Sequence, residues 1–267
     1  MIVSVSRRCD IPRFQFEWFM DRLNAGCVEA VNPFNSRQVK RVSLIPEECV
    51  IIFWTRDPRN ILATADELSY RGYRFYVMVT VTGYPLALEP SMVSTPKVLN
   101  AMKELARKIG ADRVIWRYDP ILLSSITDED FHRENFKALA ESLGGSVRRV
   151  IVSIYDEYRR SQQRLDGMEK AGGLRLIDAD VAGVLSCMAK SAEDAGMDIQ
   201  SCARKEDFSP FGIKPGACVD SELIGKLWGL AINGKGKSLR PNCLCCKSVD
   251  IGTYGLCSAR CVYCYAW

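Results

Sequence analysis

Short runs of β-branched and aromatic residues alternate along the chain with longer stretches whose apolar residues recur every three or four positions. The short apolar runs predict strands near residues 2–6, 28–32, 50–55, 75–81, 113–118, 149–155 and 198–202. The amphipathic stretches predict helices near residues 13–25, 59–71, 95–109, 129–142, 157–170, 180–195 and 219–231. This alternation is typical of repeated βα units that build a parallel α/β sheet.

Residues at the expected helix boundaries support the same division. Proline stands at two expected helix starts, and glycine at four expected ends, namely Pro12, Pro58, Gly26, Gly72, Gly110 and Gly196. An extended piece near residues 39–44 interrupts the second unit. About seven units predict a TIM-like barrel, incomplete or permuted, over residues 1–233. We expect the Cys-rich residues 234–267 to be a site-forming, iron–sulfur-binding extension rather than a second folded domain.

Composition narrows the class of protein. The 267 residues, 48% of them hydrophobic, suit one α/β domain with a sizeable core. No apolar run reaches the length of about 18 residues that a membrane span needs, and the first residues are typical of a strand rather than a signal peptide. We therefore expect a soluble cytoplasmic protein without a membrane partner. The net charge of +4 neither requires nor excludes a polyanionic partner.

Cysteine is the most informative residue type, because a reducing compartment disfavours a disulfide framework for the chain's 12 cysteines. Four of them occur singly in apolar or helical settings and are expected to be small buried hydrophobes: Cys9, Cys27, Cys49 and Cys187. The remaining eight lie at or after position 202, which favours metal or cluster ligation near the C-terminal end.

Three of these thiols, Cys257, Cys261 and Cys264, have C-x3-C-x2-C spacing. That spacing wraps one loop around three corners of a cubane and leaves the fourth iron without a protein ligand. Four thiolates normally close a cluster that only transfers electrons, so an open iron invites an exogenous ligand. The spacing therefore predicts a [4Fe–4S] cluster with one reactive corner.

The loop resembles the signature of the radical S-adenosylmethionine (SAM) superfamily, with Tyr263 in the aromatic position before Cys264. Residues 254–266 are similar to the cluster loop of spore-photoproduct-lyase-like members. The resemblance implies that SAM binds the open iron through its amino and carboxylate groups and yields a 5'-deoxyadenosyl radical on reduction. It also implies that Tyr263 contacts the adenine.

Over its whole length the chain resembles a family of bacterial and archaeal proteins catalogued as domain of unknown function eighteen forty-eight, which has no assigned reaction. The segments that carry this resemblance are residues 6–12, 53–58, 116–121 and 250–254 running into the cysteine loop.

The position of the cysteine loop departs from the radical SAM pattern, because it closes the chain instead of following the first barrel strand. A circular permutation would reconcile the two, with residues 250–254 acting as the cluster-bearing element beside the N-terminal strand. Residues 6–10 would then fall where the superfamily binds the methionine amino group with a Gly-Gly-Glu segment, and this chain has no glycine pair there.

Polar residues collect after the predicted strands, where the loops of a barrel converge on one mouth. They are Ser6, Arg7, Arg8, Asp10, Asn32, Trp54, Thr55, Arg56, Asp57, Thr80, Thr82, Tyr84, Arg117, Tyr118, Asp119, Ser153, Tyr155 and Asp156. One interpretation is a ligand cavity in which Arg7, Arg8, Arg56 and Arg117, with Asp119, bind a small molecule that carries a carboxylate or phosphate. The other is that the arginines form salt bridges in exposed loops.

A second group of thiols comprises Cys202, Cys218, Cys243 and Cys245. Four thiolates suit a second iron–sulfur cluster or a zinc ion, although unligated packed thiols are the alternative. Cys246 is assigned to neither site. The single histidine, His132, is expected on the surface or in helix packing rather than in catalysis.

Motifs for nucleotide-phosphate binding, serine hydrolases and zincins do not occur. The pattern therefore favours an iron–sulfur protein, a radical-SAM-like enzyme of unspecified substrate that needs a reductant. One rival is an iron–sulfur protein for electron transfer or redox sensing without SAM. Another is a zinc-stabilised module that binds nucleic acid through a basic turn at residues 233–237 with Arg240 and Lys247, and through stacking aromatics, Tyr254, Tyr263, Tyr265 and Trp267.

Overall fold

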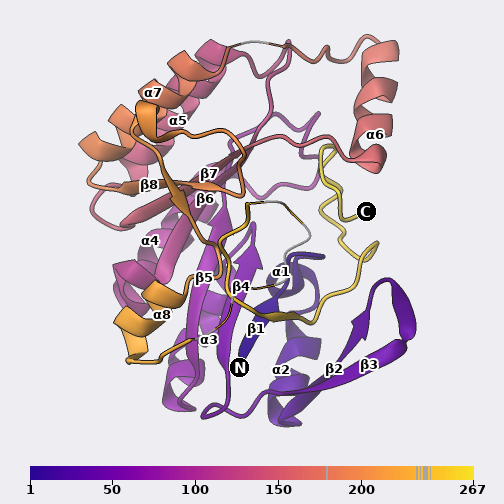
Figure 1. The fold of residues 1–267 in the computed structure, drawn as a ribbon, viewed down its shortest axis with the longest axis vertical. Helices are drawn as coiled ribbons and strands as arrows, with labels where there is room; N and C mark the ends of the chain where they lie inside the picture. The colour runs from indigo at the N-terminus through magenta and orange to yellow at the C-terminus, as the bar shows by residue number, and fades with distance from the viewer. Residues whose placement is uncertain (179, 233, 235, 237–239, 241) are drawn as a thin grey trace.

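The computed structural model describes residues 1–178, 180–232, 234, 236, 240 and 242–267 (Figure 1). The fold is a mixed α/β arrangement around an eight-stranded sheet in which every neighbouring pair is parallel. In spatial order its strands are β10 (Val249–Asp250), β1 (Ile2–Val5), β4 (Val50–Thr55), β5 (Arg74–Thr80), β6 (Val114–Ile121), β7 (Arg149–Ile154), β8 (Asp198–Cys202) and β9 (Lys214–Gly216). Among the described strands β10 and β9 are the two edges, so no closed barrel is found.

Eight α-helices and two short 3-10 helices appear in the described part of the chain. They are α1 (Ile11–Phe14), α2 (Phe16–Asn24), α3 (Arg59–Tyr70), α4 (Thr95–Ile109), η1 (Ala111–Arg113), α5 (Glu129–Leu143), α6 (Arg159–Lys170), α7 (Ala182–Asp194), η2 (Ser209–Phe211) and α8 (Ser221–Trp228). Helix α4 buries Val98, Met102, Leu105 and Ile109, a three- and four-residue spacing that places one apolar stripe against the sheet. No helix among these residues is long and apolar enough to cross a membrane.

Different elements pack against the two faces of the sheet. Val3, Ile51, Phe53 and Val77 point to the face that packs against helices α1, α2, α3, α4, α5 and α7. The alternate positions of the same strands point to the other face, where they meet α8 and the second cysteine group. The strands are therefore buried on both sides, as continuous apolar runs such as that of β4 predict.

The predicted strand at residues 28–32 forms, but its predicted place in the parallel sheet is wrong. β2 (Cys27–Asn32) pairs only with β3 (Asn35–Ser43), in a separate antiparallel hairpin. Buried and exposed positions alternate in β2, the pattern of a strand with one covered face, whereas a strand of a parallel sheet is covered on both. Asn32 therefore lies at the hairpin turn, where its side chain bonds Gln38, and not at the mouth of the sheet.

The C-terminal segment returns to the start of the chain. β10 adds to the sheet edge beside β1, with Val3 opposite Val249 and Ser4 opposite Asp250 (Figure 1). Residues after position 233 thus contribute a strand to the same sheet as residues 1–5. The cysteine loop follows this added strand.

His132 is buried in helix packing, so the surface alternative for this residue is wrong. Its side chain is fully covered, and its ring nitrogens bond the Tyr118 hydroxyl at 2.8 Å and the Leu122 carbonyl at 3.1 Å. Burial lowers the pKa of His132 to about 4, because the charged imidazolium is poorly solvated there.

The buried histidine predicts a pH-dependent contribution to stability. The pKa of His132 is lower in the folded than in the unfolded protein. Its contribution to the free energy of unfolding is therefore complete above about pH 6.5 and is lost as the pH falls through about 4. The lowering of the His132 pKa from 6.5 to about 4 corresponds to about 3 kcal/mol of unfolding free energy. We expect the difference in unfolding free energy between wild type and His132→Gln, measured in urea, to shrink by about that amount between pH 7.5 and pH 4. A difference independent of pH would contradict the assignment.

Candidate functional site

The carboxyl ends of the parallel strands bring the predicted chemistry to one end of the sheet. Residues 6–8 follow β1, Arg56 follows β4, and the cysteine loop follows β10. Arg117 and Asp119 lie in the last part of β6. Because β10, β1 and β4 are adjacent and parallel, the loops that follow them meet.

Asp250, the last residue of β10, fastens this strand to β1. Its buried carboxylate accepts hydrogen bonds from the Ser4 hydroxyl at 2.9 Å, the Ser6 hydroxyl at 2.5 Å and the Arg7 backbone N–H at 2.8 Å. The Gly252 N–H donates at 3.0 Å, and the Arg7 guanidinium lies 3.6 Å away. One carboxylate thus sets the path of both loops at the sheet edge.

Gly252 permits the close approach of these loops. A Cβ on Gly252 would overlap the Ser6 hydroxyl and would lie 2.9 Å from the Cys9 sulfur, so a larger residue does not fit without displacement. Cys9 is buried, as predicted, and lies within electrostatic range of Cys257. Burial raises the pKa of Cys9 to about 11. A fourth thiol therefore neighbours the terminal cysteine loop, a contact between residues far apart in sequence.

The structure brings Cys257, Cys261 and Cys264 within electrostatic range of one another. Cys261 is buried, whereas Cys257 and Cys264 are half-buried. The Arg164 guanidinium holds the loop by donating to the carbonyls of Val262, Cys264 and Trp267. The side chain of Arg164 in α6 thus holds the loop by its main-chain carbonyls.

Burial raises the pKa of the Cys261 thiol to about 12, and it also raises the pKa of Cys264. The Arg56 guanidinium opposes both shifts because it favours the thiolates. The metal-free thiols are therefore protonated at neutral pH, and a cluster would have to displace their protons. Arg56 would then offset part of the negative charge of the ligated sulfurs.

Tyr263 belongs to the cysteine loop, but its side chain is buried. Its hydroxyl donates to the Glu89 carboxylate and accepts from Arg56, which also pairs with Glu89 at 2.7 Å. The Thr82 hydroxyl donates to the same carboxylate oxygen at 2.5 Å. The other oxygen of Glu89 is buried and makes no hydrogen bond to the described residues. Glu89 is a site residue that the sequence did not indicate, because its segment carries no motif.

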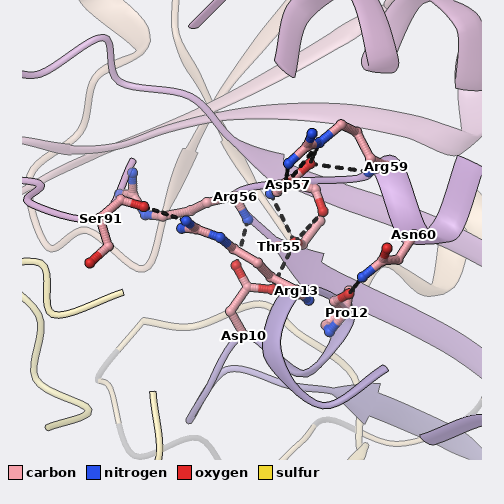
Figure 2. A network of polar contacts seen from close by, with 9 residues as sticks. All are labelled: Asp10, Pro12, Arg13, Thr55, Arg56, Asp57, Arg59, Asn60 and Ser91. Atoms are coloured by element: carbon pink, nitrogen blue, oxygen red, sulfur yellow. Dashed lines mark hydrogen bonds and ion pairs between the residues drawn. The ribbon is translucent and has the colours of Figure 1, made fainter. Parts of the chain in front are cut away.

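Asp10 lies beside Thr55 and the backbone of Arg56, as Figure 2 shows. Its carboxylate accepts from the Thr55 hydroxyl at 2.7 Å, from the Arg56 backbone N–H at 2.8 Å and from the Arg13 N–H at 3.1 Å. Burial raises the pKa of Asp10 to about 6, although the three hydrogen bonds act in the other direction. The start of α1 and the end of β4 are thereby joined behind the site.

The predicted arginines all pair with carboxylates; Arg8, Arg56 and Arg117 are half-buried, whereas Arg7 is exposed, as the salt-bridge alternative expects. Arg7 and Arg8 lie near Asp250, Arg56 pairs with Glu89, and Arg117 pairs with Asp119. Trp54 lies between two of these cations, with the guanidinium carbons of Arg7 and Arg117 at 5.7 and 4.9 Å from its ring centre. The Nε of Arg117 is buried and makes no hydrogen bond to the described residues.

The second cysteine group also comes together in space. The Cys218 thiol lies 3.4 Å from the Cys202 sulfur, and Cys245 is hydrogen-bonded to Cys218 and to Cys243. The Val219 backbone N–H donates to the Cys245 sulfur at 3.3 Å. The hydrogen bond from Cys218 lowers the pKa of Cys202 and of Cys245, and the same contacts raise the pKa of Cys218. The four predicted thiols thus form one continuous cluster.

In neither group do three or more of the described His, Cys, Asp or Glu side chains lie in a geometry that holds a single metal ion as they stand. The remaining single cysteines differ in burial, since Cys49 is buried whereas Cys27 and Cys187 are only half-buried. Cys246 is buried beside the second group and its N–H bonds the Val219 carbonyl.

The aromatic residues of the nucleic-acid alternative differ in exposure, since Tyr265 is exposed and Tyr254 is half-buried. Tyr263 is buried, and Trp267 lies under two guanidinium groups, those of Arg164 and Arg260. Of the basic turn at residues 233–237, positions 233, 235 and 237 lie outside the described residues. Arg240 pairs with Asp156.

Comparisons with known proteins identify the family of this chain but do not indicate a reaction. The model of the family described as "Domain of unknown function (DUF1848)" matches residues 2–266. Among curated proteins none matches the chain in sequence. Two solved structures of the carboxyl transferase domain of Rhizobium etli pyruvate carboxylase, one of them with pyruvate, are 15% identical with a TM-score of 0.31. The matches cover 67% and 68% of this chain, which spans about a quarter (24%) of the length of those chains.

Proposed function

The chain belongs to the family described as "Domain of unknown function (DUF1848)", and we propose that this member is an iron–sulfur enzyme of the radical-SAM-like type. In this proposal Cys257, Cys261 and Cys264 hold a [4Fe–4S] cluster with one open iron. The open eight-stranded parallel sheet supports the finer proposal of an incomplete, permuted TIM-like barrel, with residues 234–267 as the part that carries the cluster.

The observation that carries the proposal is the parallel pairing of β10 with β1. It places the cysteine loop after a sheet strand, at the carboxyl end of the sheet, although the loop closes the chain. There the three thiols lie close to one another and to Arg56, in a half-buried to buried setting that suits thiolate ligation. The residues present therefore fit the cluster.

The chain's own residues would prepare the site for an anionic small molecule. Such a cluster, when bound, supplies the electron that cleaves the SAM sulfonium. Arg117, whose buried N–H no described residue accepts, would take a carboxylate of SAM or substrate in this proposal, with Asp119 orienting its guanidinium. Arg7 and Arg8 would add positive charge beside Asp250. Tyr263, buried on Glu89, would support the loop from beneath and contact the adenine through its ring.

The test is anaerobic reconstitution of the full chain with iron and sulfide, followed by SAM and dithionite. We expect a brown protein whose reduced cluster changes its electron paramagnetic resonance (EPR) spectrum on addition of SAM, and we expect 5'-deoxyadenosine to accumulate. The EPR change reports SAM on the cluster even where cleavage waits for a substrate. A reduced cluster whose spectrum is identical with and without SAM would contradict the proposal.

One observation favours a second candidate, a closed cluster for electron transfer or redox sensing. Cys9 lies within electrostatic range of Cys257, and four thiolates would leave no iron open. Against it, the Cys9 thiol is bonded to the Thr253 backbone and to Ser6, so ligation would require it to leave both partners.

A further inference from the structure

Four cysteines from three separate segments converge behind the arginines of the site. Cys202 ends β8, Cys218 lies between β9 and α8, and Cys243 and Cys245 lie in the segment that leads to β10. Cys202, Cys218 and Cys245 are buried against the face of the sheet that α8 covers. Four thiols that gather from distant segments, in a chain where Cys27, Cys49 and Cys187 occur singly, favour a ligand set.

Two of the four sulfurs approach each other about as closely as the ligands of a single ion do. Tetrahedral Zn²⁺ with bonds of about 2.3 Å to sulfur sets neighbouring sulfurs about 3.8 Å apart. The sulfurs of Cys202 and Cys218 are 3.4 Å apart, whereas the thiolates of a cubane bind different irons and stand farther from one another. The thiols now hydrogen-bond in a chain, so ligation requires them to turn from one another toward a common centre.

The charges around the thiols also suit an ion with four thiolates. A Zn²⁺ ion with four thiolates has a net charge of about −2, which is costly to bury without cations. Arg117 lies within electrostatic range of Cys202 and Cys218, and Arg7 within range of Cys218 and Cys245. The backbone N–H of Val219 donates to the Cys245 sulfur, the kind of outer contact that orients a metal ligand.

We propose that Cys202, Cys218, Cys243 and Cys245 form a structural zinc site that joins the β8–β9 edge of the sheet to the segment preceding β10. The ion would fasten the chain shortly before the strand that carries the cysteine loop. This proposal does not depend on the function of Cys257, Cys261 and Cys264, because the two groups share no ligand.

The test uses the full chain with Cys257, Cys261 and Cys264 all replaced by alanine, so that the first group cannot bind metal. We expect the purified protein to be colourless and to hold about one zinc ion per chain by mass spectrometry of metals. A further Cys243→Ser or Cys202→Ser change should abolish the zinc. The matched control Cys246→Ser, at a buried thiol beside the group, should retain it.

Cobalt provides a second readout that does not require every variant to fold equally well. Addition of Co²⁺ to the zinc-depleted alanine variant should give the intense thiolate charge-transfer and visible bands of a tetrahedral four-sulfur site, and Zn²⁺ should displace them. Iron with acid-labile sulfide in place of zinc would overturn the proposal in favour of an auxiliary cluster. Neither zinc nor a cobalt spectrum would overturn it in favour of packed, unligated thiols.

Discussion

Replacement of Cys261 by serine is expected to abolish iron binding at the terminal loop, whereas replacement of Cys9 is expected to preserve it. Cys261 is the buried member of the three-thiol loop and lies beside Arg56. Loss of its sulfur removes one corner of the cluster, and the hydroxyl of serine is a poor replacement for thiolate on iron. Cys9 keeps its hydrogen-bond partners in the open-cluster proposal and ligates nothing.

The measurement is iron and sulfide per chain after anaerobic reconstitution, together with the visible absorption of the cluster. Cys49→Ser is the matched control, because Cys49 is as buried as Cys261 but lies before β4, at the amino end of the strands. We expect Cys49→Ser and Cys9→Ser to retain the cluster and Cys261→Ser to lose it. Loss of iron in Cys9→Ser, with Cys49→Ser intact, would assign the fourth ligand to Cys9 and replace the open cluster by a closed one.

Removal of the Asp250 carboxylate is expected to cause the largest loss of stability among changes outside the apolar core. Asp250→Ala leaves the Ser4 and Ser6 hydroxyls and the Arg7 backbone N–H without their acceptor. It also removes the counter-charge of Arg7. Breaking such a buried charged network typically costs about 3–5 kcal/mol. The strand that carries the cysteine loop would at the same time lose its side-chain attachment to β1 and keep only the backbone pairing.

Urea unfolding followed by circular dichroism measures this loss. Asp66→Ala is the control, because Asp66 is 78% exposed and its bond to Lys108 is a surface ion pair worth less than about 1 kcal/mol. Asp250→Asn keeps the shape but not the charge and is expected to fall between the two. A cost for Asp250→Ala as small as that of the control would show that the carboxylate does not hold β10 in place.

Much of the fold was predictable because the burial of apolar residues imposes a period on the sequence. Helix α4 has the predicted bounds, since its apolar stripe runs unbroken from Val98 to Ile109 and Gly110 ends it with a φ of 101°. The predicted strand at 28–32 shows the limit of this reasoning. Its residues alternate as in a half-covered strand, which argues against a place in the parallel sheet, but they do not identify β3 as the partner.

The candidate site was predictable in its residue types but not in its pairings. The spacing of Cys257, Cys261 and Cys264 is local, so the sequence alone picks them out. By contrast, Arg56 meets Glu89 and Arg7 meets Asp250 across long stretches of chain. The sequence places Asp10 and Asp57 nearer to these arginines, and no local pattern indicates the distant partners.

From the sequence alone came most of the order of strands and helices, without β9 and β10, together with the terminal thiol spacing and the cationic strand ends. Each of these depends on residues close together in the chain. The tertiary structure alone decided that β10 lies beside β1, that Cys9 neighbours Cys257, and that Cys202, Cys218, Cys243 and Cys245 meet. Buried hydrogen-bonding groups and buried charges need partners. Only the packing of the whole sheet determines which distant residues become those partners.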